Sequence, residues 1–531
     1  MENTYRDEYI LAYDLGSTGL KSAIFDVFGE VVASKYETYE TYYLRPTWIE
    51  QNPEEWWSAL CNTTITLLKE TNISPERIKA IVPVGHQIGA VPVNQEGNLL
   101  RKRAPLWCDA RNSKQARELI KKIGGYPNFY RIHGLGHPPE ILSICKAMWL
   151  KENEPDNYAQ TYKFLQSKDF IILYLTDKSV FVDDYGDASN TGWLDIKKRE
   201  YSDELLEAAG LSRDKLPDLR ESHEVVGYLG KDAAKQTGLK VETPIVLGSG
   251  DVPAGFVGGG IIEERMNYCS IGSANWTGSY ANKPCLDPDI RMINGCHPWK
   301  GYTSFSYTAA GGVSQDWFED TICDVDKKVA EQIDIASYDV TQIKAMRAPV
   351  GSAGLFYFPY LRGGGGPHWN PNSKGAFVGL TFLHKKEHLA RAVLEGVALN
   401  FRWLMDQTER AGIPIIKENG IRAIGGGAKN RAWLQIYADV LGMKVLPLKS
   451  PHEVTSRGGF ISAAVALNWY RDYPDAVEKV VKIDKIIEAD MDNNKIYNDS
   501  YPIFKSIYES LAPMFDNIAT FQEKYSTTQV E

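Results

Sequence analysis

The chain has 531 residues, more than one hydrophobic core usually serves, so two large domains are expected. Its 43% apolar and 24% charged content is typical of a globular protein, and its net charge of −9 argues against nucleic acid as the main partner. Seven scattered cysteines favour reduced thiols in a cytoplasmic protein. Neither a signal peptide nor a membrane span is expected, because the N-terminus is polar and no apolar run approaches roughly 18 residues.

The first predicted elements are two strands, 9–14 and 22–27, with a cluster of glycine and hydroxyl residues between them. In such a hairpin turn, backbone N–H groups together with Ser17, Thr18 and Lys21 can hold phosphate oxygens. Asp14, at the end of the first strand, can hold a hydrated Mg²⁺. An ordinary β-hairpin remains the alternative. The chain has no Walker A pattern, so a P-loop fold is disfavoured.

A helix is predicted from a cap at Asn52 to about residue 69, and a buried strand over 80–84. Polar groups after that strand, among them Gln87, would face the ligand crevice of an open α/β sheet. Trp107, Asp109 and Arg111 alternate, so on a strand they would share one face and suit a polyhydroxylated ligand. The alternative is a surface salt bridge beside a packed tryptophan. The acidic stretch 182–190 is interpreted as a loop, and its acidity needs no more than a solvated turn.

An apolar strand at 244–247 leads into a glycine-rich loop, 248–260, that carries one carboxylate, Asp251. Glycine on both sides of Asp251 lets backbone or ligand approach closely. This loop is the main candidate for a catalytic element. A tight turn capped by an aspartate is the alternative.

The second half repeats the opening pattern, since the strand from 267 ends in Gly272 and Ser273. Two such strand–turn units suggest two related domains that face one nucleotide. A turn of small residues at 308–314 contains Gly312, and the strand 421–424 leads into a glycine turn with Gly427, Ala428 and Asn430. The other expected elements are an exposed loop at 361–367, a helix from 386 to about 410, helices over 432–441 and 460–467, the latter opened by a turn at 458–459, and a fraying tail after 515.

The chain resembles the FGGY family of carbohydrate kinases over roughly 9–510. One family signature is met by 375–380, 388–389 and 392–395, and another is nearly met by Ser143, Lys146, Trp149, Leu150, Glu152 and Asn153. Residues 14–21 are similar to the first phosphate motif of the family, Gly272 and Ser273 to the second, and Gly426, Gly427, Ala428 and Asn430 to its adenosine motif. Asp251 lies where the family carries its catalytic aspartate.

The resemblance implies an α/β fold with two ribonuclease-H-like domains of the actin/hexokinase/heat-shock-70 superfamily and an active-site cleft between them. The expected domains are 1–255, on the sugar side, and 256–531, on the nucleotide side. The implied cofactors are ATP and Mg²⁺, the latter held through water near Asp14. The implied nucleotide-binding residues are Ser17, Thr18, Lys21, Gly272, Ser273, Gly312, Gly427, Ala428 and Asn430.

The implied reaction is transfer of the γ-phosphoryl group of ATP to a sugar hydroxyl, with Asp251 as general base. Gln87, Ile88, Trp107, Asp109 and Asp251 are the expected substrate-binding residues. D-xylulose is the leading substrate, because residues 107–111 resemble a stretch of the xylulokinase members. Ile88 and Val252 depart from the pattern of relatives, so L-xylulose, ribulose, erythritol and glycerol stay open. A homodimer and a non-catalytic regulatory relative are further alternatives.

Overall fold

The computed structural model describes residues 7–332 and 336–526, which form two compact units. The first unit contains the described residues up to Glu263, with Tyr280–Ser304 and Glu453–Val481. The second contains Glu264–Ser279, Phe305–His452 and the described residues from Lys482 onward. Two segments from the later half of the chain thus pack in the first unit, whereas the sequence suggested one division near residue 255. The first six residues, part of the polar start expected to hold no signal peptide, lie outside the described residues.

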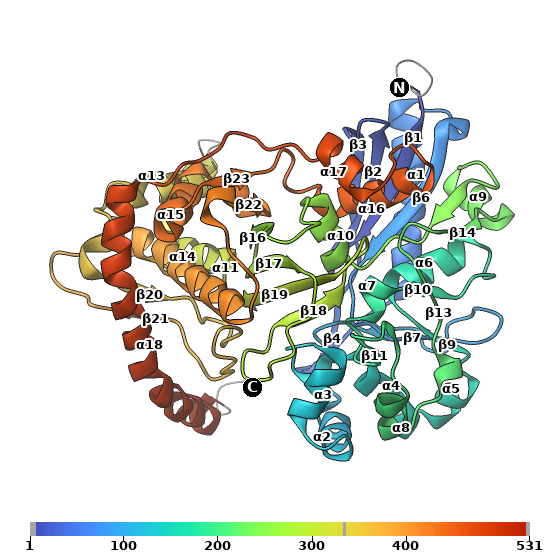
Figure 1. Cartoon of the computed structure of the whole chain (residues 1–531), viewed down its shortest axis with the longest axis horizontal. Helices are drawn as coiled ribbons and strands as arrows, with labels where there is room; N and C mark the ends of the chain where they lie inside the picture. The colour runs from blue at the N-terminus through green and yellow to red at the C-terminus, as the bar shows by residue number, and fades with distance from the viewer. Residues whose placement is uncertain (1–6, 333–335, 527–531) are drawn as a thin grey trace. The chain divides into compact units, whose positions relative to one another are not determined.

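The first unit is built on a six-stranded sheet in which the predicted hairpin is confirmed. β1 pairs antiparallel with β2 and parallel with β6, so the end of β1 lies beside the end of β6. Figure 1 shows these strands in blue at the centre of their unit. In sheet order the strands are β14 (Val225–Tyr228), β15 (Pro244–Val246), β6 (Ile78–Gly85), β1 (Tyr9–Leu15), β2 (Gly19–Asp26) and β3 (Val31–Thr38).

Helices cover both faces of this sheet, which explains why β1 and β6 are apolar along nearly their whole length. Leu11 and Tyr13 point to the face covered by α1 (Pro53–Thr71) and α6 (Ser167–Leu175), where they share a core with Trp56. The opposite face, with Val82 and Val84, is covered by α16 (Val454–Ala466) and its neighbour α10 (Asp251–Gly258). The central strands β6 and β1 are therefore a buried platform for the loops at their ends.

The contact between α10 and α16 depends on glycine. A Cβ atom on Gly258 would lie 1.8 Å from the carbonyl oxygen of Val454, and one on Gly458 would lie 1.9 Å from that of Ala254. Two expectations from the sequence are wrong in this region. Residues 251–258 form a helix rather than a glycine loop, and the glycines at 458 and 459 lie inside α16 rather than in a turn before it. Glycine disfavours an isolated helix, but here it allows two backbones to touch.

The remaining elements of the first unit surround this platform. Residues 106–112 form turns, so the expected strand face of Trp107, Asp109 and Arg111 is wrong. The acidic stretch 182–188 is buried as a short strand and a helical turn, so the expectation of a solvated turn is wrong. The strands are β4 (Tyr42–Arg45), β5 (Trp48–Gln51), β7 (Val91–Val93), β8 (Ala104–Pro105), β9 (Lys163–Leu165), β10 (Val182–Asp184), β11 (Leu194–Asp195), β12 (Glu200–Tyr201), β13 (Asp218–Arg220) and β18 (Ile293–Cys296). The helices are α2 (Ser113–Lys122), α3 (Tyr126–His133), α4 (Ser143–Asn153), α5 (Pro155–Gln160), α7 (Tyr185–Ala188), α8 (Asp203–Ala209), α9 (Lys231–Thr237) and α17 (Tyr473–Val480).

The second unit repeats the opening motif of the first. β16 (Asn267–Ile271) pairs antiparallel with β17 (Asn275–Ala281) and parallel with β22 (Ile421–Ile424), which pairs with β23 (Val445–Pro447). The turn between β16 and β17 holds Gly272 and Ser273, as the sequence predicted.

Three long helices build the core of the second unit (Figure 1, orange to red). They are α14 (Lys386–Arg410), α15 (Arg431–Leu441) and α18 (Met491–Ser526). The first two agree with the predicted bounds to within a residue. The expected fraying after 515 is wrong up to Ser526, because the helix continues to that residue; the end of the tail lies outside the described residues.

The remaining elements of this unit include a buried glycine segment. The expected exposed loop at 361–367 is largely covered, and a Cβ on Gly366 would lie 2.2 Å from the Ser306 hydroxyl oxygen. The other elements are α11 (Gly312–Thr321), α12 (Asp324–Gln332), α13 (Ser337–Ala345), β19 (Tyr302–Thr308), β20 (Phe356–Phe358) and β21 (Ala376–Val378). Single turns of 3-10 helix in the two units are η1 (Pro75–Arg77), η2 (Pro139–Ile141), η3 (Arg213–Lys215), η4 (Ser352–Gly354), η5 (Lys417–Asn419) and η6 (Gly426–Lys429).

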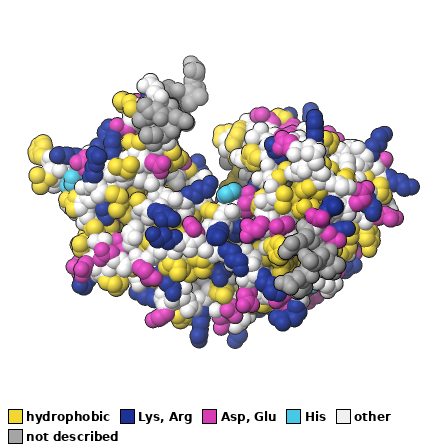
Figure 2. Space-filling model, turned by 90° about the horizontal axis from the view of Figure 1, so that it is seen from above, with side chains coloured by type: hydrophobic (Ala, Val, Ile, Leu, Met, Phe, Trp, Pro, Cys, Tyr) yellow, Lys and Arg dark blue, Asp and Glu magenta, His cyan; other side chains and the backbone are white. Residues whose placement is uncertain are grey.

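All seven cysteines are free thiols, and five of them are buried, in agreement with the expectation of reduced cysteines. Within the described part of the chain, no helix combines the length and the apolar character needed to cross a membrane. Figure 2 shows basic and acidic side chains interspersed over the face that it presents.

Candidate active site

Asp251 is the first residue of α10 and follows β15 through the short loop 247–250. Gly248 has φ of +68°, and a Cβ there would lie 1.9 Å from the carbonyl oxygen of Pro83, so only glycine fits. Gly250 forms a parallel bridge with Gly85 at the end of β6. The loop is thus fixed against the end of the sheet, and Asp251 sits at a helix N-terminus, where a negative charge is favoured.

The Asp251 carboxyl belongs to a group of charged side chains that are half-buried or, for Glu453, buried. Burial raises its pKa to about 7, with a further upward contribution from the negative charge of Asp14. Burial also raises the pKa of Asp14. The positive charge of Lys21 lowers this pKa, and the negative charge of Glu453 raises it. The Lys21 ammonium lies 3.0 Å from Glu453 and 3.9 Å from Asp14. Asp14 and Glu453 share this one lysine, and Asp251 lies close enough to Asp14 to be affected by its charge, so negative charge is in excess at this place.

Glu453 was not among the predicted site residues. It immediately precedes α16, and its carboxylate reaches Lys21 on β2. In the sequence it was visible only as a charged residue before an apolar, glycine-containing segment. Since more than 400 residues separate it from Lys21, no local pattern connects the two.

The β1–β2 turn presents its hydroxyl groups on aromatic partners. Trp107 donates its indole N–H to the Ser17 hydroxyl oxygen at 2.9 Å, and the Thr18 hydroxyl lies 2.8 Å from that of Tyr36. Because Ser17 accepts the bond from Trp107, its own hydroxyl hydrogen can donate to a phosphate oxygen. The turn is thus a preformed cluster of donors beside Asp14 and Lys21.

Trp107 and Asp109 differ sharply in their surroundings. The Trp107 side chain is 43% exposed, whereas Asp109 is fully buried. Asp109 accepts hydrogen bonds from the Ile49 amide at 2.7 Å and from the Arg111 guanidinium at 2.7 and 2.9 Å. Arg111 also pairs with Glu50 at 2.8 Å. The alternative left open by the sequence was a salt bridge on the surface, but this one is buried. It fixes the segment that carries Trp107.

Gln87 and Ile88 follow β6 and are both nearly buried. Gln87 donates to the Gly186 carbonyl at 3.2 Å and lies against Gly250. Ile88 has φ of +63°, an outlier for a β-branched residue, and its carbonyl accepts a hydrogen bond from Lys146 at 2.7 Å. Strained backbone of this kind clusters at functional sites.

The second unit holds a cavity of about 560 Å³ at the end of β16. Five predicted nucleotide-binding residues line it: Gly272, Ser273, Gly312, Gly427 and Asn430. The Gly312 amide donates to the Gly272 carbonyl at 2.7 Å, an approach that leaves no room for a side chain on Gly312. Ala428 lies outside this cavity and lines a smaller neighbouring one.

The sequence did not reveal the polar wall of this cavity. Gln315 and Asp316 come from the first turns of α11, and Tyr338, Asp339 and Gln342 come from α13. Tyr338 donates its hydroxyl to Asp316. The 338, 339 and 342 positions share one helix face, which is the signal that could have suggested them, but nothing local linked that face to a glycine turn.

Matches to known proteins cover most of the chain. The N-terminal domain of the FGGY family of carbohydrate kinases matches residues 9–258, and the C-terminal domain of that family matches residues 268–467. A xylulose kinase of Staphylococcus epidermidis is 30% identical over 97% of this chain and 99% of its own. A gluconokinase of Bacillus subtilis is 28% identical over 97% of this chain and 98% of its own.

Solved structures show the same fold. A ligand-bound xylulose kinase from Lactobacillus acidophilus matches 96% of this chain and 100% of its own with a TM-score of 0.86 at 24% identity. Plasmodium falciparum glycerol kinase with ADP matches 95% and 98% with a TM-score of 0.83 at 20% identity. The expected two-domain α/β fold is thereby confirmed. The chain belongs to the FGGY family of carbohydrate kinases.

Proposed function

We propose that this ATP-dependent sugar kinase phosphorylates a hydroxyl of a ketopentose, D-xylulose first among them, with Asp251 as the general base. The observation that carries the proposal is the Asp251 carboxyl, held at the N-terminus of α10 with its pKa raised to about 7. A base works best when its pKa lies near the working pH. The names of several similar proteins, which are xylulose kinases, support the choice of sugar.

In the proposed reaction, the sugar hydroxyl oxygen attacks the γ-phosphorus of ATP while Asp251 accepts the hydroxyl proton. The bond between that phosphorus and the bridging oxygen breaks, and ADP leaves. Phosphoryl transfer depends mainly on in-line positioning and charge neutralisation. Lys21 and the donors of Ser17 and Thr18 supply positive charge and hydrogen bonds for the phosphate.

The cavity of the second unit is the proposed nucleotide site. Its floor is backbone at Gly272, Gly312 and Gly426, which lets a ligand approach closely. The N-terminus of α11 begins at this cavity, where the helix dipole favours a negatively charged group such as phosphate. Asp316 and Tyr338 offer polar contacts to the rest of the nucleotide.

The residues around Asp14 fit a Mg²⁺ ion. Their carboxylates are the oxygen donors that this cation prefers, and the excess negative charge among Asp14, Asp251 and Glu453 would be offset by a divalent ion. Asp14 would hold it through water. When bound, Mg²⁺ would neutralise phosphate charge.

Specificity among sugars is proposed to depend on Gln87, Ile88, Trp107 and Asp109. Ile88 and Val252 offer no hydrogen-bonding side chain, so a hydroxyl beside them would stay unmatched, at a cost of roughly 1–3 kcal/mol if buried. We therefore expect activity on more than one ketopentose or polyol.

The test is ADP release by the purified protein with ATP, Mg²⁺ and a panel of sugars. The panel contains D-xylulose, L-xylulose, D-ribulose, L-ribulose, erythritol, glycerol and gluconate, with no added sugar as the control. The highest kcat/KM is expected for D-xylulose. A higher value for another compound would overturn the choice of sugar, and ADP release that no sugar stimulates would favour a regulatory, non-catalytic role.

A further inference from the structure

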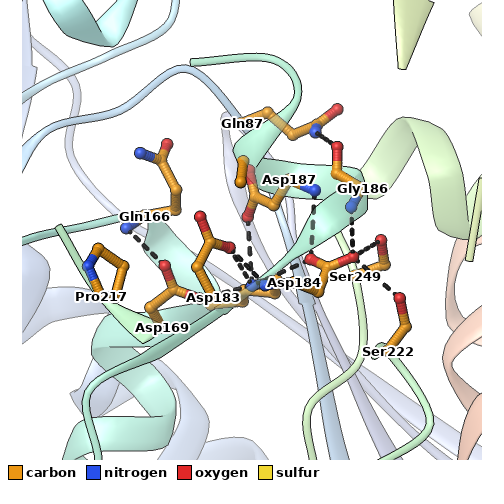
Figure 3. Close-up of polar contacts among 12 residues, drawn as sticks. Gln87, Gln166, Asp169, Asp183, Asp184, Gly186, Asp187, Pro217, Ser222 and Ser249 are labelled. Carbon is orange, nitrogen blue, oxygen red and sulfur yellow. Dashed lines mark hydrogen bonds and ion pairs between the residues drawn. The ribbon is translucent and has the colours of Figure 1, made fainter. Parts of the chain in front are cut away.

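A buried cluster of charges lies directly behind the loop that carries Asp251. Figure 3 shows Asp169, Asp183, Asp184 and Asp187 pointing toward one another, from α6, β10 and α7. The Lys168 ammonium lies among them, at 2.5, 2.9, 3.2 and 3.5 Å from Asp169, Asp183, Asp184 and Asp187, respectively. These five residues are at most 1% exposed.

The protein itself supplies the cation of this cluster, since the Lys168 ammonium contacts all four carboxyl groups. One positive charge cannot balance four negative ones in a dry interior, and burial raises the pKa of Asp169, Asp183 and Asp187. Such an arrangement is costly unless its geometry is well fixed.

Asp184 connects the cluster to the candidate base. Its Oδ2 atom accepts hydrogen bonds from the Ser249 hydroxyl at 2.6 Å, the Ser222 hydroxyl at 2.9 Å and the Gly186 amide at 2.9 Å. Ser249 precedes Asp251 by two residues and is 1% exposed. Figure 3 shows Ser249 and Ser222 both directed at Asp184.

Ser249 is well placed to fix this loop, because its two neighbours, Gly248 and Gly250, are glycines without side chains. Both glycines are packed closely: a Cβ on Gly250 would lie 2.4 Å from Gln87, and Gly248 lies under the Pro83 carbonyl. Packing limits where the loop can lie, but a directional bond from the Ser249 hydroxyl to the fully buried Asp184 carboxyl sets its orientation.

We propose that Ser249 and Asp184 are positioning residues for phosphoryl transfer, which hold Asp251 in register with the substrate hydroxyl. This inference rests on the proposed role of Asp251. Neither residue touches substrate; both act through the geometry of the base. A misplacement of about 1 Å can cost about 100-fold in rate, because the reacting atoms must be aligned.

Ser249→Ala with Ser222→Ala as a matched control tests the proposal. Each change removes one hydroxyl donor from the same oxygen of Asp184, but Ser222 lies on the segment before β14. Ser222 meets the Asp251 loop through its backbone carbonyl, which accepts from the Gly248 amide at 2.9 Å and is kept in Ser222→Ala. Ser249→Ala is expected to lower kcat about 10- to 100-fold, with the KM for ATP and for sugar within about twofold of wild type. Ser222→Ala is expected to stay within about twofold in kcat, with a similar fall in melting temperature for both variants.

A purely structural role of Ser249 would lower the melting temperature or the fraction of active protein without this selective loss of kcat. Equal kcat values in the two variants would overturn the proposal. If Ser249→Ala does not fold, Ser249→Cys is the second variant, since a thiol is a weaker hydrogen-bond donor than a hydroxyl. An intermediate kcat is expected, and a wild-type kcat would count against the inference.

Asp251→Asn distinguishes a failure of the proposed base from a failure of the positioning role. If Ser249 acts through Asp251, adding Ser249→Ala to Asp251→Asn should change the residual kcat by less than about twofold. Wild-type turnover in Asp251→Asn would overturn the role of Asp251 itself. A strong loss in Asp251→Asn together with wild-type turnover in Ser249→Ala would overturn only the positioning role. If the kcat losses of the two single variants multiplied in the double variant, the positioning role would likewise be overturned.

Discussion

The two candidate binding regions are built in opposite ways. Around Asp251, polar and charged side chains are buried or half-buried and are held by charged partners, as Lys21 is by Glu453 and Ser249 by Asp184. Around the second-unit cavity, the predicted contacts are mostly glycines, whose backbone lines the space at Gly272, Gly312 and Gly426.

This difference indicates what each region does. Burying a charged side chain costs free energy. Such side chains suit a place where a proton is transferred or a charge develops, because electrostatic interactions are stronger in a low dielectric. Bare backbone suits a ligand such as a nucleotide phosphate, which is bound through N–H groups. Changes in the first region should therefore act on kcat, and changes in the second on the KM for ATP.

The largest effect is expected from Asp251→Asn. Loss of a general base commonly costs about 10²–10⁴-fold in rate. Steady-state kinetics should show this loss in kcat, and calorimetry should show nearly unchanged ATP binding. Asp26→Asn is the control, because Asp26 caps the β2–β3 turn through the amides of Phe28 and Glu30. Turnover close to wild type in Asp251→Asn would remove the functional contrast between the regions.

The pH dependence should follow the same carboxyl. Asp251 has a pKa raised to about 7 and acts as a base only when deprotonated, so kcat/KM for the sugar should fall as the pH drops below this value, by about tenfold per unit. Mg²⁺ near Asp14 would move the fall to lower pH by cancelling the charge of Asp14. Rates measured from pH 5 to 9 check this. An identical acid limb in Asp251→Asn would assign it to another group.

In the cavity, Gly426 and Gly427 make a matched pair. A Cβ on Gly426 meets open space, whereas one on Gly427 would lie 2.4 Å from the Ile271 side chain. Gly426→Val should therefore crowd the nucleotide and raise the KM for ATP on the order of tenfold, with kcat largely retained. Gly427→Ala should instead lower stability by about 1–3 kcal/mol, since it overpacks the core. An unchanged KM for ATP in folded Gly426→Val would place the nucleotide elsewhere.

The smallest effect is expected from Ile88→His. Histidine tolerates the left-handed backbone of this position better than isoleucine does, and its imidazole can bond a sugar hydroxyl. The ratio of kcat/KM for D-xylulose to that for L-xylulose should rise a few-fold, about 1 kcal/mol in discrimination. Ile88→Leu, which adds no polar group, is the control. The same ratio in both variants would show that Ile88 only packs.

Local patterns were sufficient for the hairpin turns, whereas at Asp251 they left a tight turn as the alternative, and the role of base came from the family resemblance. Strand periodicity and glycine placement predicted β1, β2, β16 and the turns between them, because side chains alternate on strands and glycine marks turns. An apolar strand followed by glycines singled out Asp251. The same local rules were wrong at 251–258 and 458–459, where tertiary packing of two helices overrides the low helix propensity of glycine.

The sequence by itself determined the family motifs, the order of strands and helices that carry them, and the residue types available for catalysis. The tertiary structure decided which charges meet. It buried the acidic stretch 182–188 against Lys168, brought Glu453 to Lys21, and added Asp316 and Tyr338 to the glycine-lined cavity. The physical reason is the separation along the sequence between interacting residues. Turns and strands follow from neighbours a few residues apart, whereas the energy of a buried charge depends on partners that only the fold brings within hydrogen-bonding distance.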